Sequence, residues 1–306
     1  MSAMPDTGSI DAPAAVHDAT ARQCDAAADG EVWLAQLSDP HLSKPQQSVS
    51  RFSKAALGVR GWQRRSRHHA AASLAATVSA MRACCPDHIL VTGDLTQVGQ
   101  ATEFREAAAW LWTVAAPEHV TVLPGNHDAY MPGSWGVGHT ILAPYASPDY
   151  PVVRRIGCVL LIGLSSAVAT PMGMASGRLG PGQLEALRAA LQQGRQDGLF
   201  RLVALHHDPC LTGLRQWRKG LHDRTLLQAI LHQEGAELVV HGHNHRHSLH
   251  ALTGPAGPIW VAGAPSASVR GWSQRTQGGF VLYKVKRRAE GFGLRVCVPY
   301  IPSEAT

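Results

Sequence analysis

The chain has 306 residues, of which 45% are hydrophobic and 16% charged, and its mean hydropathy is −0.08. This composition provides enough apolar material for a large core and excludes a wholly disordered protein. No run of 18 apolar residues occurs, and the first thirty residues contain five aspartates instead of a basic start followed by an apolar block. We therefore predict neither a membrane span nor a signal peptide.

The net charge of +6 is concentrated in one segment. From Pro40 to Pro86 there is no Asp or Glu, whereas eight Lys and Arg residues occur there. A local field of this sign attracts phosphates or an anionic membrane surface.

The six cysteines show no C-x-x-C spacing; they are Cys24, Cys84, Cys85, Cys158, Cys210 and Cys297. Such scattered cysteines are typical of free thiols in a reducing compartment. We accordingly expect a cytoplasmic protein.

Along the chain, residues 1–30 are rich in Ala and Asp without apolar periodicity, and we expect a disordered leader. Residues 31–302 are expected to form a single domain. Short apolar runs predict buried strands at 32–37, 89–91, 120–123, 159–164, 202–205 and 238–240. Helical patterns at 70–84, 103–115, 183–193 and 224–234 alternate with them. This alternation predicts an α/β fold.

Beyond residue 247 the pattern contains strands alone, at 247–252, 259–262, 280–286 and 294–298. We expect these strands to form a second sheet that packs on the first.

Residues 42–69 form a longer connection than a strand-to-helix link needs, and we interpret them as a basic amphipathic insert that is a candidate cap. On a helical wheel the apolar residues Phe52, Val59 and Trp62 share one face. Arg51, Lys54 and Arg64 lie on the other face.

Polar residues of metal-ligand type follow five of the predicted strands. They form the blocks Asp39-Pro40-His41, Gly93-Asp94, Gly125-Asn126-His127-Asp128, His206-His207-Asp208-Pro209 and His241-Gly242-His243-Asn244-His245. Because ligands of open α/β sheets bind at the carboxyl ends of the strands, we expect these blocks to converge. Capping of turns explains Asp39, Asp94 and Asn126, but does not require the histidines.

Carboxylates and imidazoles suit Mn, Fe and Zn, and one carboxylate can bridge two ions about 3.5–4 Å apart. Asp94 is our candidate for the bridging residue. The i, i+2 spacing in Asp39/His41 and His243/His245 lets two ligands leave one turn on the same side. His241 is expected to end its strand and not to bind metal.

The ordered set of blocks resembles the calcineurin-like metallophosphoesterases. The resemblance implies a four-layer α/β/β/α sandwich with two mixed sheets and a site for two divalent metal ions. Carried over by position, it assigns Asp39, His41, Asp94 and His245 to one metal, and Asp94, Asn126, His206 and His243 to the other. His206 is preferred to His207 because it directly follows the apolar strand, and the resembling proteins have a ligand at that position.

The resemblance also implies a mechanism. Two cations make a bridging hydroxide available near neutral pH and neutralise the phosphoryl oxygens. His127 is expected on the leaving-group side as a general acid, and Asp128 is expected to fix its tautomer and favour its protonated form.

Three groups of Trp and Arg suggest a rim for a substrate with anionic and apolar parts, such as a nucleotide or a phospholipid headgroup. They are Trp62 with Arg64, Trp217 with Arg215, Arg218 and Lys219, and Trp272 with Arg270 and Arg275. The substrate-binding candidates are Asn126, His127, Trp62, Arg64 and Trp217. The alternative is that the tryptophans fill the core and the arginines are solvated.

The rim and the basic insert also favour peripheral contact with an anionic membrane. No nucleic-acid-binding motif accompanies the basic charge, so a specific nucleic-acid partner is not expected. The sequence specifies no oligomeric state.

The sequence as a whole favours a phosphodiesterase that uses a dinuclear metal centre. Its L-H-H-x-P context at 205–209 resembles the branch of small bacterial cyclic-nucleotide and glycerophosphodiester phosphodiesterases. The alternative is a lipid-pathway pyrophosphatase resembling the UDP-diacylglucosamine hydrolases. A non-catalytic metal-binding scaffold is a third hypothesis, but such a protein should lack ligands or His127.

Overall fold

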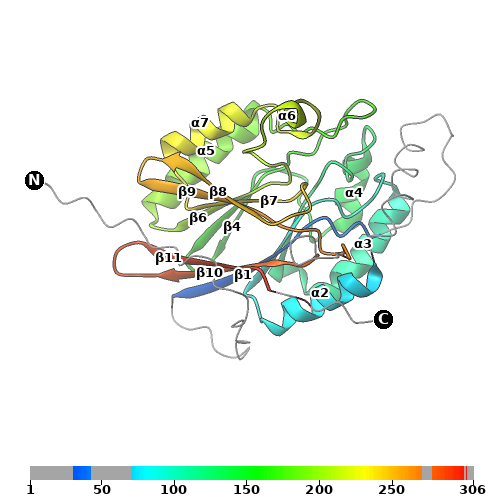
Figure 1. Ribbon diagram of the computed structural model, residues 1–306, viewed down its shortest axis with the longest axis horizontal. Coiled ribbons are helices and arrows are strands. Elements are labelled where there is room, and N and C mark those ends of the chain that lie inside the picture. The colour runs from blue at the N-terminus through cyan, green and yellow to red at the C-terminus, as the bar shows by residue number, and fades with distance from the viewer. Residues whose placement is uncertain (1–29, 43–69, 271–277, 300, 302–306) are drawn as a thin grey trace, which may run out of the picture.

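Two β-sheets face each other, and helices cover the outer face of each (Figure 1). The computed structural model describes residues 30–42, 70–270, 278–299 and 301. The predicted leader and all but Leu42 of the predicted insert therefore lie outside the described residues, except for Gly30.

The first sheet has five strands in the order β11-β10-β1-β2-β3. Their bounds are β1 Glu31–Leu37, β2 His88–Thr92, β3 Val120–Leu123, β10 Val281–Arg287 and β11 Phe292–Cys297. β1, β2 and β3 run parallel, whereas β10 pairs antiparallel with both β1 and β11. The sheet is therefore mixed, as the sequence predicted.

The second sheet has six strands in the order β4-β5-β6-β7-β9-β8. Their bounds are β4 Val152–Ile156, β5 Val159–Gly163, β6 Phe200–Ala204, β7 Leu238–His241, β8 Ser248–Gly254 and β9 Gly257–Gly263. The four inner strands are parallel, and the edge strands β4 and β8 are antiparallel to their neighbours.

Three apolar cores separate the four layers. α2 (Ala71–Ala83), α3 (Ala101–Val114) and α4 (Ser134–Leu142) pack on the first sheet. α5 (Pro181–Gln196) and α7 (Arg224–Glu234) pack on the second sheet, and a third core joins the two sheets. Two short helices, η1 (Pro117–His119) and α6 (Leu214–Lys219), lie in connections. The α/β/β/α sandwich is confirmed.

The sequence of β1 shows why both faces of this sheet are covered. Val32 and Leu34 enter the core between the sheets, whereas Trp33, Ala35 and Leu37 pack towards the helices. Successive side chains of a strand point to opposite faces, so a strand covered on both sides is mostly apolar. Gln36 is the buried polar exception in β1. None of the described helices combines the length and the apolarity that crossing a bilayer requires.

The expectation of a separate C-terminal sheet is wrong. β9 pairs with β7 and extends the second sheet, whereas β10 pairs with β1 and extends the first. The C-terminal strands thus satisfy open edges of two existing sheets, and apolar periodicity does not specify which edge a strand joins.

The sequence analysis missed β4, α4 and α6. α4 contains Gly136 and Gly138, which interrupt the helical pattern. A Cβ at Gly138 would lie 2.5 Å from Phe104 Cζ, so the glycine allows α4 to pack closely on α3. Its role is visible only in the packing.

The cysteine interpretation is wrong at one residue. Cys84, Cys158, Cys210 and Cys297 are free thiols, but Cys85 is disulfide-bonded. Irregular spacing of cysteines does not exclude a disulfide bond.

A buried polar network joins the two sheets close to the carboxyl ends of their strands. The Tyr283 hydroxyl donates to Gln36 Oε1 at 2.7 Å. Gln36 Nε2 donates to Thr92 Oγ1 at 2.9 Å and to the His241 carbonyl at 3.1 Å. Gln36 therefore links β10, β1 and β2 to β7 in the opposite sheet.

We predict that Gln36→Leu lowers the free energy of unfolding by about 2 kcal/mol, because the buried Tyr283 hydroxyl loses its acceptor. Urea denaturation measures the change. Adding Tyr283→Phe should recover part of the loss, since the unpaired hydroxyl is then removed. If Gln36→Leu alone is as stable as the wild type, the network does not stabilise the fold.

Candidate metal centre

The loops after β1, β2, β3, β6 and β7 meet at one end of the sandwich. Backbone hydrogen bonds tie them together: Asp39 N donates to Gly93 O, His41 N to Asp94 O, and Gly242 N to His206 O, each at 3.0 Å. This convergence of strand ends is the one predicted from the sequence.

Close approach between these loops explains the glycines in two of the blocks. A Cβ at Gly125 would collide with the Asp94 carboxylate, and one at Gly93 would collide with the backbone of Gly125. Gly93 also has a φ of 91°, a conformation that other residues rarely adopt. The glycines therefore let the loops after β2 and β3 come into contact.

The backbone is strained where the candidate ligands lie. Six non-glycine residues among those described have positive φ, and five of them are Asp39, His41, Asp94, His243 and His245, with φ between 45° and 66°. Such conformations cost about 1–3 kcal/mol each and persist where the surroundings enforce them, often at functional sites.

One group of side chains comprises Asp39, His41, Asp94 and His245. Asp39 Oδ1 lies 3.2 Å from His245 Nε2, and the Nε2 atoms of His41 and His245 are 3.4 Å apart. The second oxygen of Asp39 is engaged elsewhere, because it accepts hydrogen bonds from Ser38 Oγ and His243 N. Oδ1 is therefore the oxygen of Asp39 that faces the imidazoles.

The second group comprises Asp94, His206 and His243. His206 Nε2 lies 3.4 Å from Asp94 Oδ2 and 3.1 Å from Asn126 Oδ1. The His206 and His243 rings are 5.1 Å apart. Asn126 thus lies beside this group, as the sequence predicted.

Asp94 belongs to both groups. Its Oδ2 lies 3.4 Å from His206 Nε2 and 3.9 Å from His41 Nε2, whereas Oδ1 accepts a hydrogen bond from His127 N at 2.8 Å. A single carboxylate oxygen therefore faces imidazoles from both groups, which is the position required of a bridging ligand.

The donor set fits divalent cations. Asp39 Oδ1 and His243 Nε2 are buried and have no hydrogen-bond partner among the described residues. The Nδ1 atoms of His206 and His41 face the carbonyls of Thr92 and Thr96, at 2.7 and 3.3 Å. Donation from Nδ1 to a carbonyl leaves Nε2 as a lone-pair donor, the usual arrangement of metal-binding histidines.

Burial and charge set the protonation of these groups in opposite directions. Burial opposes ionisation of Asp94, but the charges of His206 and His127 hold the pKa of its carboxyl well below the usual range. Burial likewise disfavours a charged His206, yet Asp94 raises the pKa of its imidazole to about 9. At His243, burial and the nearby His207 lower the pKa and favour the neutral form, which is the form that binds metal.

The structure brings His206 to the cluster and not His207. Both ring nitrogens of His207 are engaged, Nδ1 with Ser166 Oγ at 2.8 Å and Nε2 with the Ala175 carbonyl at 3.2 Å. His241, expected to end its strand, is the last residue of β7 and belongs to neither group.

His127 lies at the edge of the cluster, but Asp128 does not orient it. His127 Nδ1 is 2.6 Å from the Gln97 carbonyl, and this contact, not Asp128, sets its tautomer. The ring is half-buried, 5.0 Å from that of His41 and stacked on Tyr130 at 5.7 Å. The hydrogen bonds of the Asp128 carboxylate go to Leu95, Thr96 and Gly125, so they do not support the expectation that Asp128 fixes the tautomer of His127.

Asp128 instead braces the loops that carry Asp94 and Asn126. Its carboxylate accepts hydrogen bonds from Thr96 N at 3.0 Å, Thr96 Oγ1 at 2.9 Å, Gly125 N at 2.9 Å and Leu95 N at 3.3 Å. Burial and the charge of Asp94 raise the pKa of Asp128 to about 7, although its backbone hydrogen bonds act in the opposite direction.

Sequence reasoning also missed a residue that holds the last block. Asp208 Oδ2 accepts a hydrogen bond at 2.8 Å from Asn244 Nδ2, and Asn244 lies between His243 and His245. Asp208 is part of the H-H-D-P block, so its position directly after His206-His207 was an available signal. The carbonyls of Thr92 and Gln97, which contact the imidazoles of His206 and His127, could not be predicted from the sequence, because every residue carries a carbonyl.

The predicted rim is described only in part. Trp62, Arg64, Trp272 and Arg275 lie outside the described residues. Trp217, on α6, is 69% exposed and so does not fill the core.

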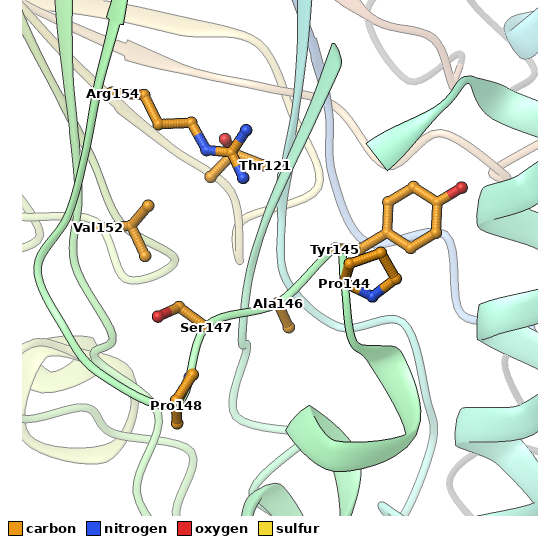
Figure 2. Close-up of a pocket in the computed structure, with 8 residues that line it drawn as sticks. All are labelled: Thr121, Pro144, Tyr145, Ala146, Ser147, Pro148, Val152 and Arg154. Atoms are coloured by element: carbon orange, nitrogen blue, oxygen red, sulfur yellow. The ribbon is translucent and has the colours of Figure 1, made fainter. Parts of the chain in front are cut away.

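A cavity of about 260 Å³ lies away from the cluster, between the edge strands β3 and β4 (Figure 2). Its lining consists of Thr121, Pro144, Tyr145, Ala146, Ser147, Pro148, Val152 and Arg154. No candidate ligand lines it, so the metal cluster and this cavity are separate features.

Comparison with known proteins agrees with this geometry. The calcineurin-like phosphoesterase family model matches residues 32–247. A probable cyclic nucleotide phosphodiesterase of Synechococcus sp. (strain WH7803) is 30% identical over 245 residues, which are 77% of this chain and 82% of the relative. Another, from Rhodococcus erythropolis, is 30% identical over 166 residues, and this match spans about half of each protein, 52%.

Solved structures share the fold. A purple acid phosphatase from yellow lupin seeds superposes with a TM-score of 0.56 at 10% identity, over 89% of this chain and 55% of the plant protein. A dimetal phosphatase from Danio rerio gives a TM-score of 0.50 at 12% identity, over 90% of this chain and 100% of that protein. The architecture is thus that of the metallophosphoesterases. The chain belongs to the calcineurin-like phosphoesterase family.

We predict that Asp128→Ala lowers the free energy of unfolding by about 3 kcal/mol, because buried N–H groups of Leu95, Thr96 and Gly125 lose their acceptor. Bound metal should fall in parallel, since the same loops carry Asp94 and Asn126. Denaturation and metal analysis measure both, with exposed Asp149→Ala as the control. If the variant is as stable as the wild type and loses turnover only on esters with poor leaving groups, Asp128 acts through His127 and does not brace the loops.

Proposed function

We propose that this protein is a dinuclear metal-dependent phosphoesterase. The observation that carries the proposal is the Oδ2 atom of Asp94, which faces His41 of one ligand group and His206 of the other. We assign one cation to Asp39, His41, Asp94 and His245, and the second to Asp94, Asn126, His206 and His243. The oxygen and nitrogen donors suit Mn, Fe or Zn.

Two divalent cations, when bound, lower the pKa of water between them and neutralise negative charge on phosphoryl oxygens. The chain's own contribution is to hold the ligands rigidly. Asp94 is anchored through Oδ1 to His127 N, and His206 through Nδ1 to the Thr92 carbonyl. This preorganisation avoids rearrangement when charge develops at phosphorus.

His127 is proposed as the general acid. Because its Nδ1 contacts the Gln97 carbonyl, we assign donation to the leaving-group oxygen to Nε2. His127 lies outside both ligand groups and is half-buried. It can therefore contact a substrate without being needed as a metal ligand.

A phosphodiester is the favoured substrate class. Two relatives that are 30% identical carry the name probable cyclic nucleotide phosphodiesterase, which supports a nucleotide-like diester. The presence of every candidate ligand together with His127 supports catalysis over a metal-binding scaffold.

We expect metal-stripped protein refilled with Mn to hydrolyse bis-p-nitrophenyl phosphate faster than the corresponding monoester. Asp94→Asn should lose at least about a hundredfold in rate together with bound metal, because both sites share this carboxylate. Asp149→Asn, a substitution at an exposed position, is the matched control. Two metals bound by the Asp94→Asn variant with unchanged hydrolysis would refute the bridging role.

We expect His127→Ala to keep both metals and to lose about 10²- to 10⁴-fold in rate on esters with poor leaving groups. Esters with good leaving groups need little protonation, so their hydrolysis should fall much less. The comparison uses a series of leaving groups of rising pKa, with His250→Ala at an exposed position as the control. Equal losses across the series would exclude the general-acid role.

A further inference from the structure

Exposed apolar side chains gather on two loops of the second sheet. The loop after β5 carries Met172, and the loop after β6 contains α6 with Leu214 and Trp217. Their exposed fractions are 55% for Met172, 94% for Leu214 and 69% for Trp217. We call these three residues the apolar patch.

Hydrogen bonds hold the two loops side by side. Ala175 N donates to Arg218 O at 2.8 Å, Gly177 N donates to Gly220 O at 3.1 Å, and Arg218 Nη2 donates to the Gly173 carbonyl at 3.1 Å. Met172 adjoins Gly173 and Trp217 adjoins Arg218, so these exposed apolar residues lie next to the hydrogen-bonded segments of two neighbouring loops. α6 lies at the top of the view in Figure 1.

The two loops that carry the apolar patch also carry positive charge. Residues 165–184 and 209–222 contain no Asp or Glu, and their cationic residues Arg178, Arg215, Arg218 and Lys219 are all exposed. Within α6, Leu214 and Trp217 are three residues apart and share a side of the helix. Arg215 and Lys219, four apart, share another side. This short helix is therefore amphipathic, with a cationic face.

The other large exposed apolar residues of the described chain do not share this setting. Trp112, Val137, Val153 and Leu226 lie on four different elements, α3, α4, β4 and α7. Single exposed apolar residues are normal on soluble proteins, whereas a group of them bordered by cations indicates an interaction surface.

The loop that carries Met172 contacts a residue beside the metal cluster. The Ala175 carbonyl, in the loop of Met172, contacts His207 Nε2 at 3.2 Å, and the His207 ring lies 4.7 Å from that of His243. A surface held by the patch would therefore lie close to the candidate ligands.

We propose that the apolar patch and the surrounding cations form a peripheral binding surface for an anionic lipid bilayer. Leu214, Trp217 and Met172 enter the boundary between headgroups and acyl chains, and Arg178, Arg215 and Lys219 contact the acidic headgroups. Insertion of apolar side chains together with electrostatic attraction is the physics of such interfacial contacts. This binding does not depend on the proposed phosphoesterase activity.

The test is co-sedimentation of the full chain with phosphatidylcholine vesicles, with or without 30% phosphatidylglycerol. We expect binding to the anionic vesicles alone, decreasing as salt is raised. The double variant Leu214→Ser/Met172→Ser should bind at least about tenfold more weakly, because it removes buried apolar area. Arg215→Gln should weaken binding about fivefold by removing one cation at the surface.

Leu226→Ser, at a 59% exposed position on α7, is the matched control and should bind as the wild type does. Hydrolysis of bis-p-nitrophenyl phosphate is measured in parallel without vesicles, and the double variant should retain it. If the wild type does not hydrolyse this ester, the proposed function is refuted, whereas the result on vesicle binding still stands.

Two outcomes would overturn the membrane proposal. The first is equal vesicle binding by the wild type and the double variant, or none by either. The second is dimerisation of the wild type without vesicles that the double variant abolishes, which would make the apolar patch an interface between two copies of the chain.

Discussion

The buried carboxylate of Asp94 is the constraint on which the rest of the site depends. An ionised carboxylate in the interior is stable only with partners for both oxygens. The backbone of His127 supplies one, and the imidazoles of His41 and His206 face the other. These residues follow β3, β1 and β6, so strands of both sheets must end at the same point.

That convergence has a structural cost, which is visible in the backbone. Asp39, His41, Asp94, His243 and His245 all adopt left-handed conformations, which their hydrogen-bonded loops enforce. The apolar core between the sheets and the Gln36 network keep the two sheets in fixed relation. The stability of the sandwich therefore holds strained loops in the arrangement that brings the candidate ligands together.

The same loops connect the chemistry to the surface. His206 and His207 are adjacent, yet His206 faces Asp94 whereas His207 anchors the loop that carries Met172 through the Ala175 carbonyl. The lipid-facing surface that we propose is thus built directly on the segment that supplies a candidate ligand.

The sequence by itself determined the α/β alternation and the strands that end in polar blocks of metal-ligand type, because apolar periodicity and short polar blocks are local signals. The resemblance of these blocks to a family implied the four layers and the ligand assignment. Tertiary structure alone decided that the C-terminal strands divide between two sheets, that Asp128 braces loops while the Gln97 carbonyl orients His127, and that Cys85 is bonded. Each of these depends on partners distant in the chain. Edge pairing, backbone carbonyl contacts and disulfide bonding leave no pattern in the residues that make them, so they emerge only when the chain is folded.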